Sequence, residues 1–357
     1  MTTMRFQCRL LTLAAVICFP ASESMAQATR PVAVTVTAHR FDGLPLADLP
    51  IILESSNGVI GMGKSNEGGS LVLQAMVPSS DAVVGVSLAS GDLPVFTPGQ
   101  RDGLVGLNRV RFGALCFSPQ YTIVLSPDVT EYTLEVTGFE CVSAVFSVAD
   151  AAGAPVRASA ISSIAEPERA RFRGHPGFSL RISKGQSGFV NILTSSRHLL
   201  VRLTPEQTTS DVALGTITAA PRVDGGHLTI DSTNVDELVT ALMGVYSPGA
   251  LLVSADGLSI FPITETLGRD ESGARKMSFV NVSVPVGNFY VVPTGALWPA
   301  WARGLLDAIA AGADLSNSGV PMVTIAPGQH VTTNIDVMAA YRALFQLRRY
   351  SVQPQNP

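Results

Sequence analysis

Hydrophobic and polar residues alternate along most of this chain, with the period of two that is typical of half-buried β-strands. The clearest case is the run in which Val32, Val34 and Val36 alternate with Ala and Thr. Turn pairs such as Asp42-Gly43 follow, and strand signals recur about every 10 residues. This spacing favours a mainly β fold built from sandwiches over βαβ units.

The same alternation predicts strands over most of the remaining chain. They are expected at residues 49–53, 71–73, 82–88, 142–148, 155–161, 178–182, 188–193, 199–203, 280–284, 289–292 and 330–337. A length of 357 residues then indicates two or three linked Ig-like or transthyretin-like β-sandwich domains. We expect these domains at residues 30–138, 139–220 and 221–337, followed by a tail at 338–357.

Helical patterns enter in the last third of the chain. Asn234 and Glu237 match a capping box ahead of apolar positions that share one helical face. A second helix is predicted from Pro299 to about Ala311, with Gly312 as its stop signal. The last domain is therefore expected to carry one or two short helices. For residues 338–350 a short helix is favoured over a strand extension.

The chain opens with the residue order of a cleavable export signal. Arg5 and Arg9 precede an apolar run at residues 10–19, and small residues lead to a cut after Ala26. A cut after Ala28 fits the same pattern. An apolar run of about 10 residues spans only ~15 Å as a helix, half of the ~30 Å hydrocarbon core. We therefore expect a signal peptide at residues 1–26 and a periplasmic or secreted protein without a transmembrane anchor after cleavage.

Cleavage changes both the cysteine count and the charge. Cys8 and Cys18 leave with the signal, so Cys116 and Cys141 remain in an oxidising compartment and are predicted to form a disulfide. The bond would close a loop of about 25 residues and contribute ~3 kcal/mol. The 24 basic and 28 acidic residues fall to 22 and 27, which moves the formal charge from −4 to −5. This mild charge without a basic patch argues against a nucleic-acid partner.

Several short stretches resemble carboxypeptidase-regulatory-like, transthyretin-like sandwich modules. Residues 42–53 (DGLPLADLPIIL) and 65–73 (SNEGGSLVL) resemble the first strand, turn and next strand of that family. Residues 150–156 (DAAGAPV) echo the first element, and residues 284–291 (VPVGNFYV) and 323–329 (VTIAPGQ) echo later strands. The resemblance implies a sandwich fold with an accessory, adhesive or spacer role. It carries no catalytic residues over.

Residues 58–65 (GVIGMGKS) match the phosphate-loop pattern G-x-x-x-x-G-K-S. That loop binds phosphate only when a helix begins directly after it. Here Gly68 and Gly69 follow, and alternating strand residues come next. We therefore interpret the stretch as a glycine-rich β-hairpin and predict no nucleotide.

Other candidate chemistry is sparse. The histidines stand singly in the sequence, at positions 39, 175, 198, 227 and 330. We therefore predict neither a metal nor another cofactor. The nearest acidic clusters, Glu166 with Glu168 and Asp270 with Glu271, fall in predicted polar loops. We predict no enzyme, and an enzyme of unrecognised type built on distant carboxylates is the weakest alternative.

Aromatic residues gather at the predicted strand-to-helix junction, where Tyr290, Trp298 and Trp301 lie. Exposed rings there would stack on a sugar or anchor a partner protein, whereas buried rings would cover the core of the last domain. The leading prediction is an exported non-catalytic protein that binds a macromolecule or supports a cell-envelope assembly, with a protein or glycan partner. The alternative is a carbohydrate-binding module that uses Trp298 and Trp301.

Overall fold

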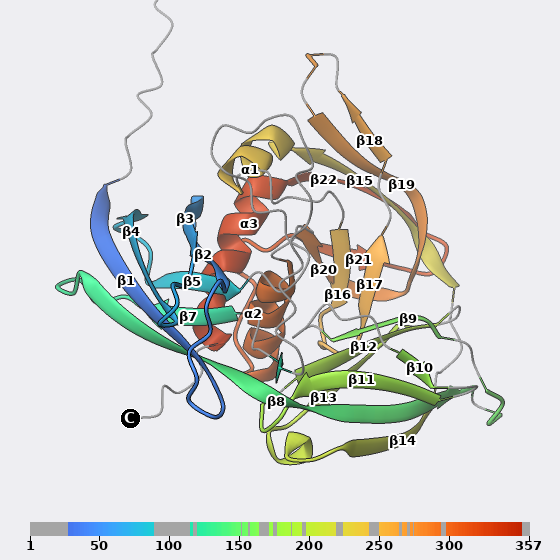
Figure 1. Cartoon of the computed structure of the whole chain (residues 1–357). Coiled ribbons are helices and arrows are strands. Elements are labelled where there is room, and N and C mark those ends of the chain that lie inside the picture. Colours follow the sequence, from blue (N-terminus) through green and yellow to red (C-terminus); the bar gives the residue numbers. More distant parts are fainter. Residues whose placement is uncertain are drawn as a thin grey trace, which may run out of the picture.

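The computed structural model confirms a mainly β protein with several sheets and a few short helices (Figure 1). It describes residues 28–88, 115–116, 120–150, 152–155, 158–163, 171–173, 177–186, 188–194, 198–218, 224–242, 250–263, 266–269, 272–273, 275–293 and 298–351. The predicted signal peptide lies outside these residues. The described strands form three two-layer sandwiches, which we call the first, second and third modules.

The first module comprises the described residues from 28 to 138. One layer has the strand order β4-β1-β8 and the other has the order β3-β2-β5-β7. Val32, Val34 and Val36 point into its core and are buried, as their alternation predicts. Its strands are β1 (Thr29–Arg40), β2 (Pro50–Ser55), β3 (Gly58–Lys64), β4 (Ser70–Pro78), β5 (Val83–Leu88), β6 (Leu115–Cys116), β7 (Gln120–Val124) and β8 (Glu131–Ala149).

The second module, described between residues 139 and 218, begins inside β8. This strand runs for 19 residues without a break. Its first half pairs with β1, and its second half pairs with β11 and β14. The expected border at 138/139 thus falls within a strand that two sandwiches share. The module's other elements are β9 (Ala158–Ser163), β10 (Arg171–Arg173), β11 (Gly177–Ser183), β12 (Gly188–Thr194), β13 (His198–Leu203), η1 (Glu206–Thr208) and β14 (Val212–Thr218).

The third module comprises the described residues from 224 to 351. Its layers have the orders β18-β19-β15-β22 and β17-β16-β20-β21. Its strands are β15 (Asp224–Thr233), β16 (Ala250–Ser254), β17 (Ile260–Ile263), β18 (Thr266–Arg269), β19 (Arg275–Pro285), β20 (Gly287–Pro293), β21 (Met322–Ile325) and β22 (His330–Asp336). Its helices are α1 (Val235–Ala241), α2 (Trp298–Ala310), α3 (Val337–Gln346) and η2 (Leu347–Ser351). The predicted helix at 338–350 is thereby confirmed.

One strand arrangement recurs in all three modules. The first strand of each module pairs antiparallel with a middle strand and parallel with the last one. These sets are β1 with β4 and β8, β8 with β11 and β14, and β15 with β19 and β22. The chain is therefore a tandem array of similarly wound sandwiches, and helices are inserted only in the third of them.

The predicted capping box at α1 is wrong, although the helix itself is present. Asn234 has a φ of 60°, whereas a side chain that caps a helix needs an extended backbone. Its Nδ2 instead donates to Asp336 Oδ2 at 2.8 Å. Asp336 is the true cap of α3, since its Oδ1 accepts from the backbone N–H of Met338 and Ala339 at 3.0 and 2.9 Å.

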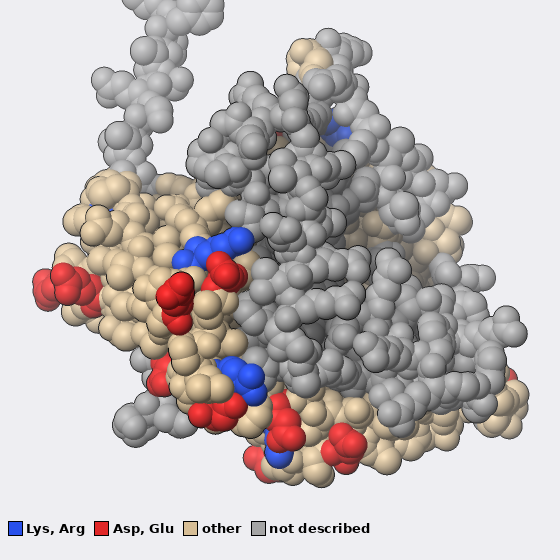
Figure 2. Space-filling view, in the orientation of Figure 1, with Lys and Arg blue, Asp and Glu red and all other residues tan. Residues whose placement is uncertain are grey.

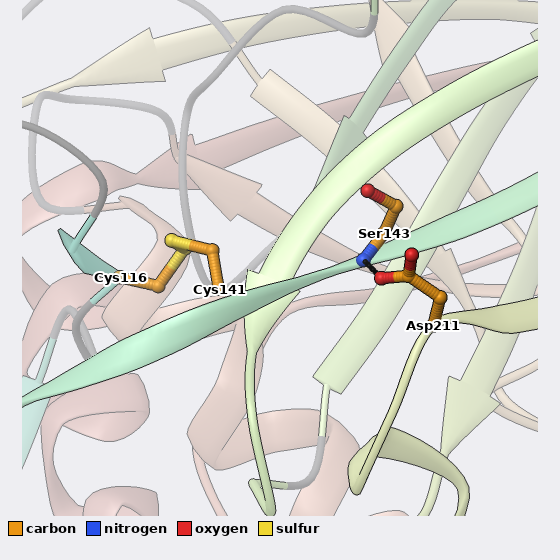
Figure 3. The surroundings of a disulfide bond; sticks show 4 residues. All are labelled: Cys116, Cys141, Ser143 and Asp211. Atoms are coloured by element: carbon orange, nitrogen blue, oxygen red, sulfur yellow. Dashed lines mark hydrogen bonds between the residues drawn. A yellow bond between two sulfur atoms is a disulfide. The ribbon is translucent and has the colours of Figure 1, made fainter.

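The predicted disulfide is confirmed. Cys116 on β6 is bonded to Cys141 on β8, with 5.3 Å between the Cα atoms (Figure 3). Close by, the Ser143 N–H donates to Asp211 Oδ1 at 2.8 Å and ties the start of β14 to the same strand. The shared strand is thus fastened at the point where it passes from the first module into the second.

Replacing both Cys116 and Cys141 with serine is expected to lower the free energy of unfolding by about 3 kcal/mol. The physical reason is that the disulfide limits the unfolded chain by closing a loop with a sequence separation of 25. Urea denaturation under oxidising conditions measures the loss. Wild-type protein with a reductant is the control and should show the same loss, whereas an unchanged midpoint in both samples would contradict the prediction.

Candidate functional site: a polar junction at the C-terminal helix

Helix α3 of the third module lies on the side of that module that faces the first (Figure 1), and η2 contacts β5 and β7 of the first module. The apolar residues of α3 belong to a core cluster that also includes Ile52 on β2 and Val83, the first residue of β5. The buried residues of α3 are Val337, Met338, Ala340, Tyr341, Ala343, Leu344 and Phe345. The segment that the sequence sets apart as a tail is therefore part of a core that two modules share.

Two opposite charges face each other at this junction. Glu54 on β2 and Arg348 on η2 are each 0% exposed, and Arg348 Nη1 donates to Glu54 Oε2. Ser87 on β5 donates its hydroxyl to the same carboxylate oxygen at 3.2 Å and accepts from Arg348 Nη2 at 3.4 Å. Because removing an ion from water costs several kcal/mol, each of these charges depends on the other to remain buried.

The first module makes room for the arginine with a glycine. A Cβ atom at Gly85 would overlap the guanidinium of Arg348. The guanidinium therefore fits against β5 only because residue 85 is a glycine. On the other side, the guanidinium lies 5.7 Å from the centre of the Phe345 ring. Helix α2 also approaches closely at Gly304, where a Cβ would lie 3.1 Å from the Arg348 backbone nitrogen. The arginine is thus enclosed on several sides.

Further polar contacts join α3 to the first module. The Tyr341 hydroxyl donates to the Ser55 carbonyl oxygen at 2.7 Å. Asp81 is buried, accepts from the Ser56 N–H and hydroxyl at 2.8 and 2.6 Å, and accepts from Gln346 Nε2 at 3.4 Å. Burial raises the pKa of Tyr341 well above its ordinary value, and the nearby Glu54 carboxylate raises this pKa further. The phenol therefore remains a protonated donor at neutral pH.

Replacing Tyr341 with phenylalanine is expected to lower the free energy of unfolding by about 1–3 kcal/mol, because the buried Ser55 carbonyl loses its donor. Since the folded-state pKa of Tyr341 is raised, its contribution is full below the ordinary tyrosine pKa of about 10 and declines as the pH rises above it. The variant should lack this alkaline loss. Denaturation midpoints at pH 7 and above pH 10 measure both effects. Tyr350→Phe is the exposed control, and equal stability of Tyr341→Phe and wild type at pH 7 would refute the role.

The end of the chain is also tied to α2 and to the second module. Asp307 on α2 accepts from Arg303 Nε and from the Ser351 hydroxyl, both at 2.8 Å. Arg202 on β13 brings its Nη2 to 3.9 Å from the other carboxylate oxygen. One carboxylate thus connects the C-terminal segment, the inserted helix and the second module.

The phosphate-loop match was predicted to be a glycine-rich β-hairpin, and it forms strand β3, which pairs antiparallel with β2 across a short turn. Its first glycine lies at a second contact between the first and third modules. Gly58 has a φ of 110°, and a Cβ at this position would overlap the carbonyl oxygen of Ala241 at the end of α1. Lys64 at the end of β3 is exposed, and a turn leads from it into β4. The close approach of the third module to the first therefore accounts for the glycine.

None of the residues predicted from the sequence to bind a ligand is among the residues described at this junction. Tyr290 on β20 is half-buried and packs against the core of the third module. Trp298 and Trp301 both lie in the first turn of α2, but their side chains are outside the described part of the structure. The same holds for the acidic candidates Glu166, Glu168, Asp270 and Glu271. The proposed ligand role of the aromatic residues thus stays a prediction.

Among the described residues, no group of three or more His, Cys, Asp or Glu side chains is placed to hold a metal ion. No helix among them is long and apolar enough to cross a membrane.

Sequence reasoning missed the junction itself. Glu54 directly follows the apolar run at residues 49–53, and Arg348 directly follows an apolar helical stretch and precedes Arg349. A charge that borders an apolar run is a signal for a buried partner. The sequence does not say which of the many opposite charges is that partner, because the two residues are 294 positions apart.

Comparisons with known proteins give distant structural likenesses only. No protein-family model and no curated protein matches the chain. The Bacillus anthracis TIE protein is 10% identical over 86% of this chain and 50% of its own, with a TM-score of 0.20. Shaft pilin SpaA from Lactobacillus rhamnosus GG is 10% identical over 54% of this chain and 99% of its own, with a TM-score of 0.21. BcpA, the major pilin subunit of Bacillus cereus, is 8% identical over 86% and 99%, with a TM-score of 0.21.

The chain thus spans about half the length of the first of these proteins. Likenesses with TM-scores this low indicate nothing about the function of this chain.

Proposed function

We propose that this chain is an exported, non-catalytic component of the cell envelope. In this proposal, three firmly joined sandwich modules form one body that supports or presents a macromolecular partner. The observation that carries the proposal is the buried pair of Glu54 and Arg348, which fastens the end of the chain to its first module. The export signal predicted from the sequence is the basis for the proposed location outside the cytoplasm.

The buried ionisable groups support a structural role. Glu54 and Arg348 neutralise each other, and Asp81 accepts hydrogen bonds from Ser56 and Gln346. These contacts are internal, and two of them, Glu54 with Arg348 and Asp81 with Gln346, link the first module to the third. A chain of independently folding domains would not require such contacts between its first and last modules.

The strand arrangement supports resistance to tension. In every module the first and last strands are parallel neighbours, so pulling the start of the first strand away from the end of the last strand loads the hydrogen bonds between them in shear. Bonds loaded in shear must break together rather than one after another. The strand β8 and its disulfide then pass the load from the first module to the second.

The recurring sandwich arrangement is compatible with the resemblance to carboxypeptidase-regulatory-like modules. Such modules occur as accessory or spacer units, and this resemblance therefore supports a structural role. On the described surface that faces the viewer in Figure 2, basic and acidic side chains are interspersed. A mixed surface of this kind suits a protein or glycan partner better than a polyanion.

Crosslinking in the native envelope, followed by mass spectrometry of the captured partners, tests the proposal. We expect a reproducible protein or glycan partner joined to wild-type chain, and a reduced yield for a chain that carries Arg348→Met. Two results together would contradict the proposal: no partner is captured, and the purified chain turns over a substrate in a hydrolase panel. Alanine changes at Glu166, Glu168, Asp270 and Glu271 would then locate the activity.

A carbohydrate-binding role is the second candidate, and one observation favours it. Helix α2 begins at Trp298, directly beyond β20, and packs against that strand, which carries the half-exposed Tyr290. Quenching of tryptophan fluorescence by acrylamide tests it, with Trp301→Ala to separate the two signals. Rings fully shielded from acrylamide would exclude this role without affecting the structural proposal.

A further inference from the structure

Two histidines that stand far apart in the sequence are direct neighbours in the third module. His227 on β15 and His330 on β22 are paired in the parallel register of these strands. Both side chains are exposed, and their ring centres are 6.3 Å apart with the rings tilted by 59°. The spacing of histidines in the sequence gives no hint of this pair, because the register of the two strands creates it.

The backbone beneath the pair is firmly held. The His227 N–H donates to the Gln329 carbonyl at 2.8 Å, and the Gly328 N–H donates to the Gly225 carbonyl at 2.7 Å. A Cβ at Gly226 would overlap the Gln329 carbonyl oxygen, so the start of β15 approaches the turn before β22 as closely as a glycine permits. The two histidines are thus placed by backbone contacts rather than by flexible loops.

A neighbouring hydroxyl orients one of the rings. Thr229 Oγ1 lies 2.9 Å from His330 Nε2. In metal sites, the ring nitrogen that does not bind the ion commonly donates to a carboxylate, a backbone carbonyl or a water oxygen, which fixes the tautomer and leaves the other nitrogen for coordination. The Thr229 hydroxyl oxygen is placed to accept from His330 in the same way. This contact leaves Nδ1 of His330 for an ion shared with His227.

We propose that His227 and His330 form an exposed site for a late first-row divalent ion, of the class of Cu²⁺ or Zn²⁺. Neutral imidazole is a preferred ligand of these ions. A metal–nitrogen bond of about 2.0–2.1 Å to each ring requires the rings to move slightly closer, which rotation of two exposed side chains allows. Water fills the remaining coordination positions. The argument for this site does not use the structural role proposed above.

An ion at this position would act on the C-terminal junction. It would bridge β15 and β22, and β22 runs directly into Asp336, which caps α3. Stabilising the pairing of these two strands therefore also stabilises the segment that carries Tyr341 and Arg348.

Titration of the untagged full chain with Cu²⁺ at pH 7.5 tests the site, because Cu²⁺ binds nitrogen ligands most tightly among these ions. We expect one ion per chain, with electron paramagnetic resonance couplings from imidazole nitrogen. His227→Gln or His330→Gln should each weaken binding about tenfold or more. Zn²⁺ should raise the thermal midpoint of wild type but not of His330→Gln.

The matched control is His39→Gln, since the His39 ring contacts Glu135 and Thr137. This change should leave the titration as in wild type. Metal-free thermal midpoints of all three variants show that each one folds. The proposal is overturned if Cu²⁺ does not saturate near one ion per chain. It is also overturned if either the His227 or the His330 variant binds as wild type does.

Discussion

Replacing Arg348 with methionine is expected to lower the free energy of unfolding by about 3–5 kcal/mol, because the Glu54 carboxylate then remains buried without its partner. Ser87 still donates to this carboxylate, but one neutral hydroxyl does not replace a guanidinium. Urea denaturation at pH 7 measures the loss. Arg349→Met is the matched control, because Arg349 is exposed and lies over the Tyr350 ring. It should change the stability by less than about 0.5 kcal/mol.

The double variant Glu54→Met with Arg348→Met distinguishes the effect of an unpaired buried charge from the effect of lost packing contacts. Replacing a whole buried ion pair with apolar residues is often neutral, so the double variant should recover most of the stability that Arg348→Met loses. The hydrogen bonding of the pair is also incomplete, since Glu54 Oε1 and Arg348 Nε have no hydrogen-bond partner among the described residues. Losses that simply add in the double variant would show that the two charges do not act as a pair.

Replacing Gly58 with alanine is expected to lower the free energy of unfolding by about 3 kcal/mol or more. The backbone φ of 110° is unfavourable for any residue with a Cβ, and the added methyl would overlap the Ala241 carbonyl oxygen at the end of α1. Since that oxygen is backbone, the helix itself must move. Thermal and urea denaturation both measure the effect.

Gly61→Ala is the control from the same glycine-rich stretch. A Cβ at Gly61 would make only ordinary contacts, with its nearest neighbour 3.8 Å away on Leu53, so the stability should stay close to that of wild type. Equal effects at Gly58 and Gly61 would mean that the close approach of α1 does not explain the first glycine.

Local alternation was enough to predict most of the strands. Val32, Val34 and Val36 alternate with polar or small residues, and the structure buries all three. The same rule also fits each half of β8. Its buried residues on both sides of the expected border share one phase, from Leu134 to Val136 and from Val142 to Val148. Glu140 holds the same phase at the border but is exposed, so the hydrophobic pattern is interrupted there while the strand continues.

The contacts between modules could not be predicted in the same way. They depend on pairs that only the complete fold brings together, such as Glu54 with Arg348 and His227 with His330. The capping box shows the same limit at short range. Its residue types are correct, yet Asn234 adopts a left-handed backbone and bonds to Asp336, which is 102 positions away. Tertiary contacts outweighed the local pattern.

Amide hydrogen exchange of wild type and Arg348→Met, under conditions where both are folded, tests most directly whether the C-terminal helix fastens the first module to the third. We expect faster exchange in β2, β5, α3 and η2 of the variant, because these elements surround the lost guanidinium. Exchange in β11 and β12 of the second module should be unchanged. Unchanged exchange in β2 and β5, or an equal increase in all three modules, would contradict this expectation.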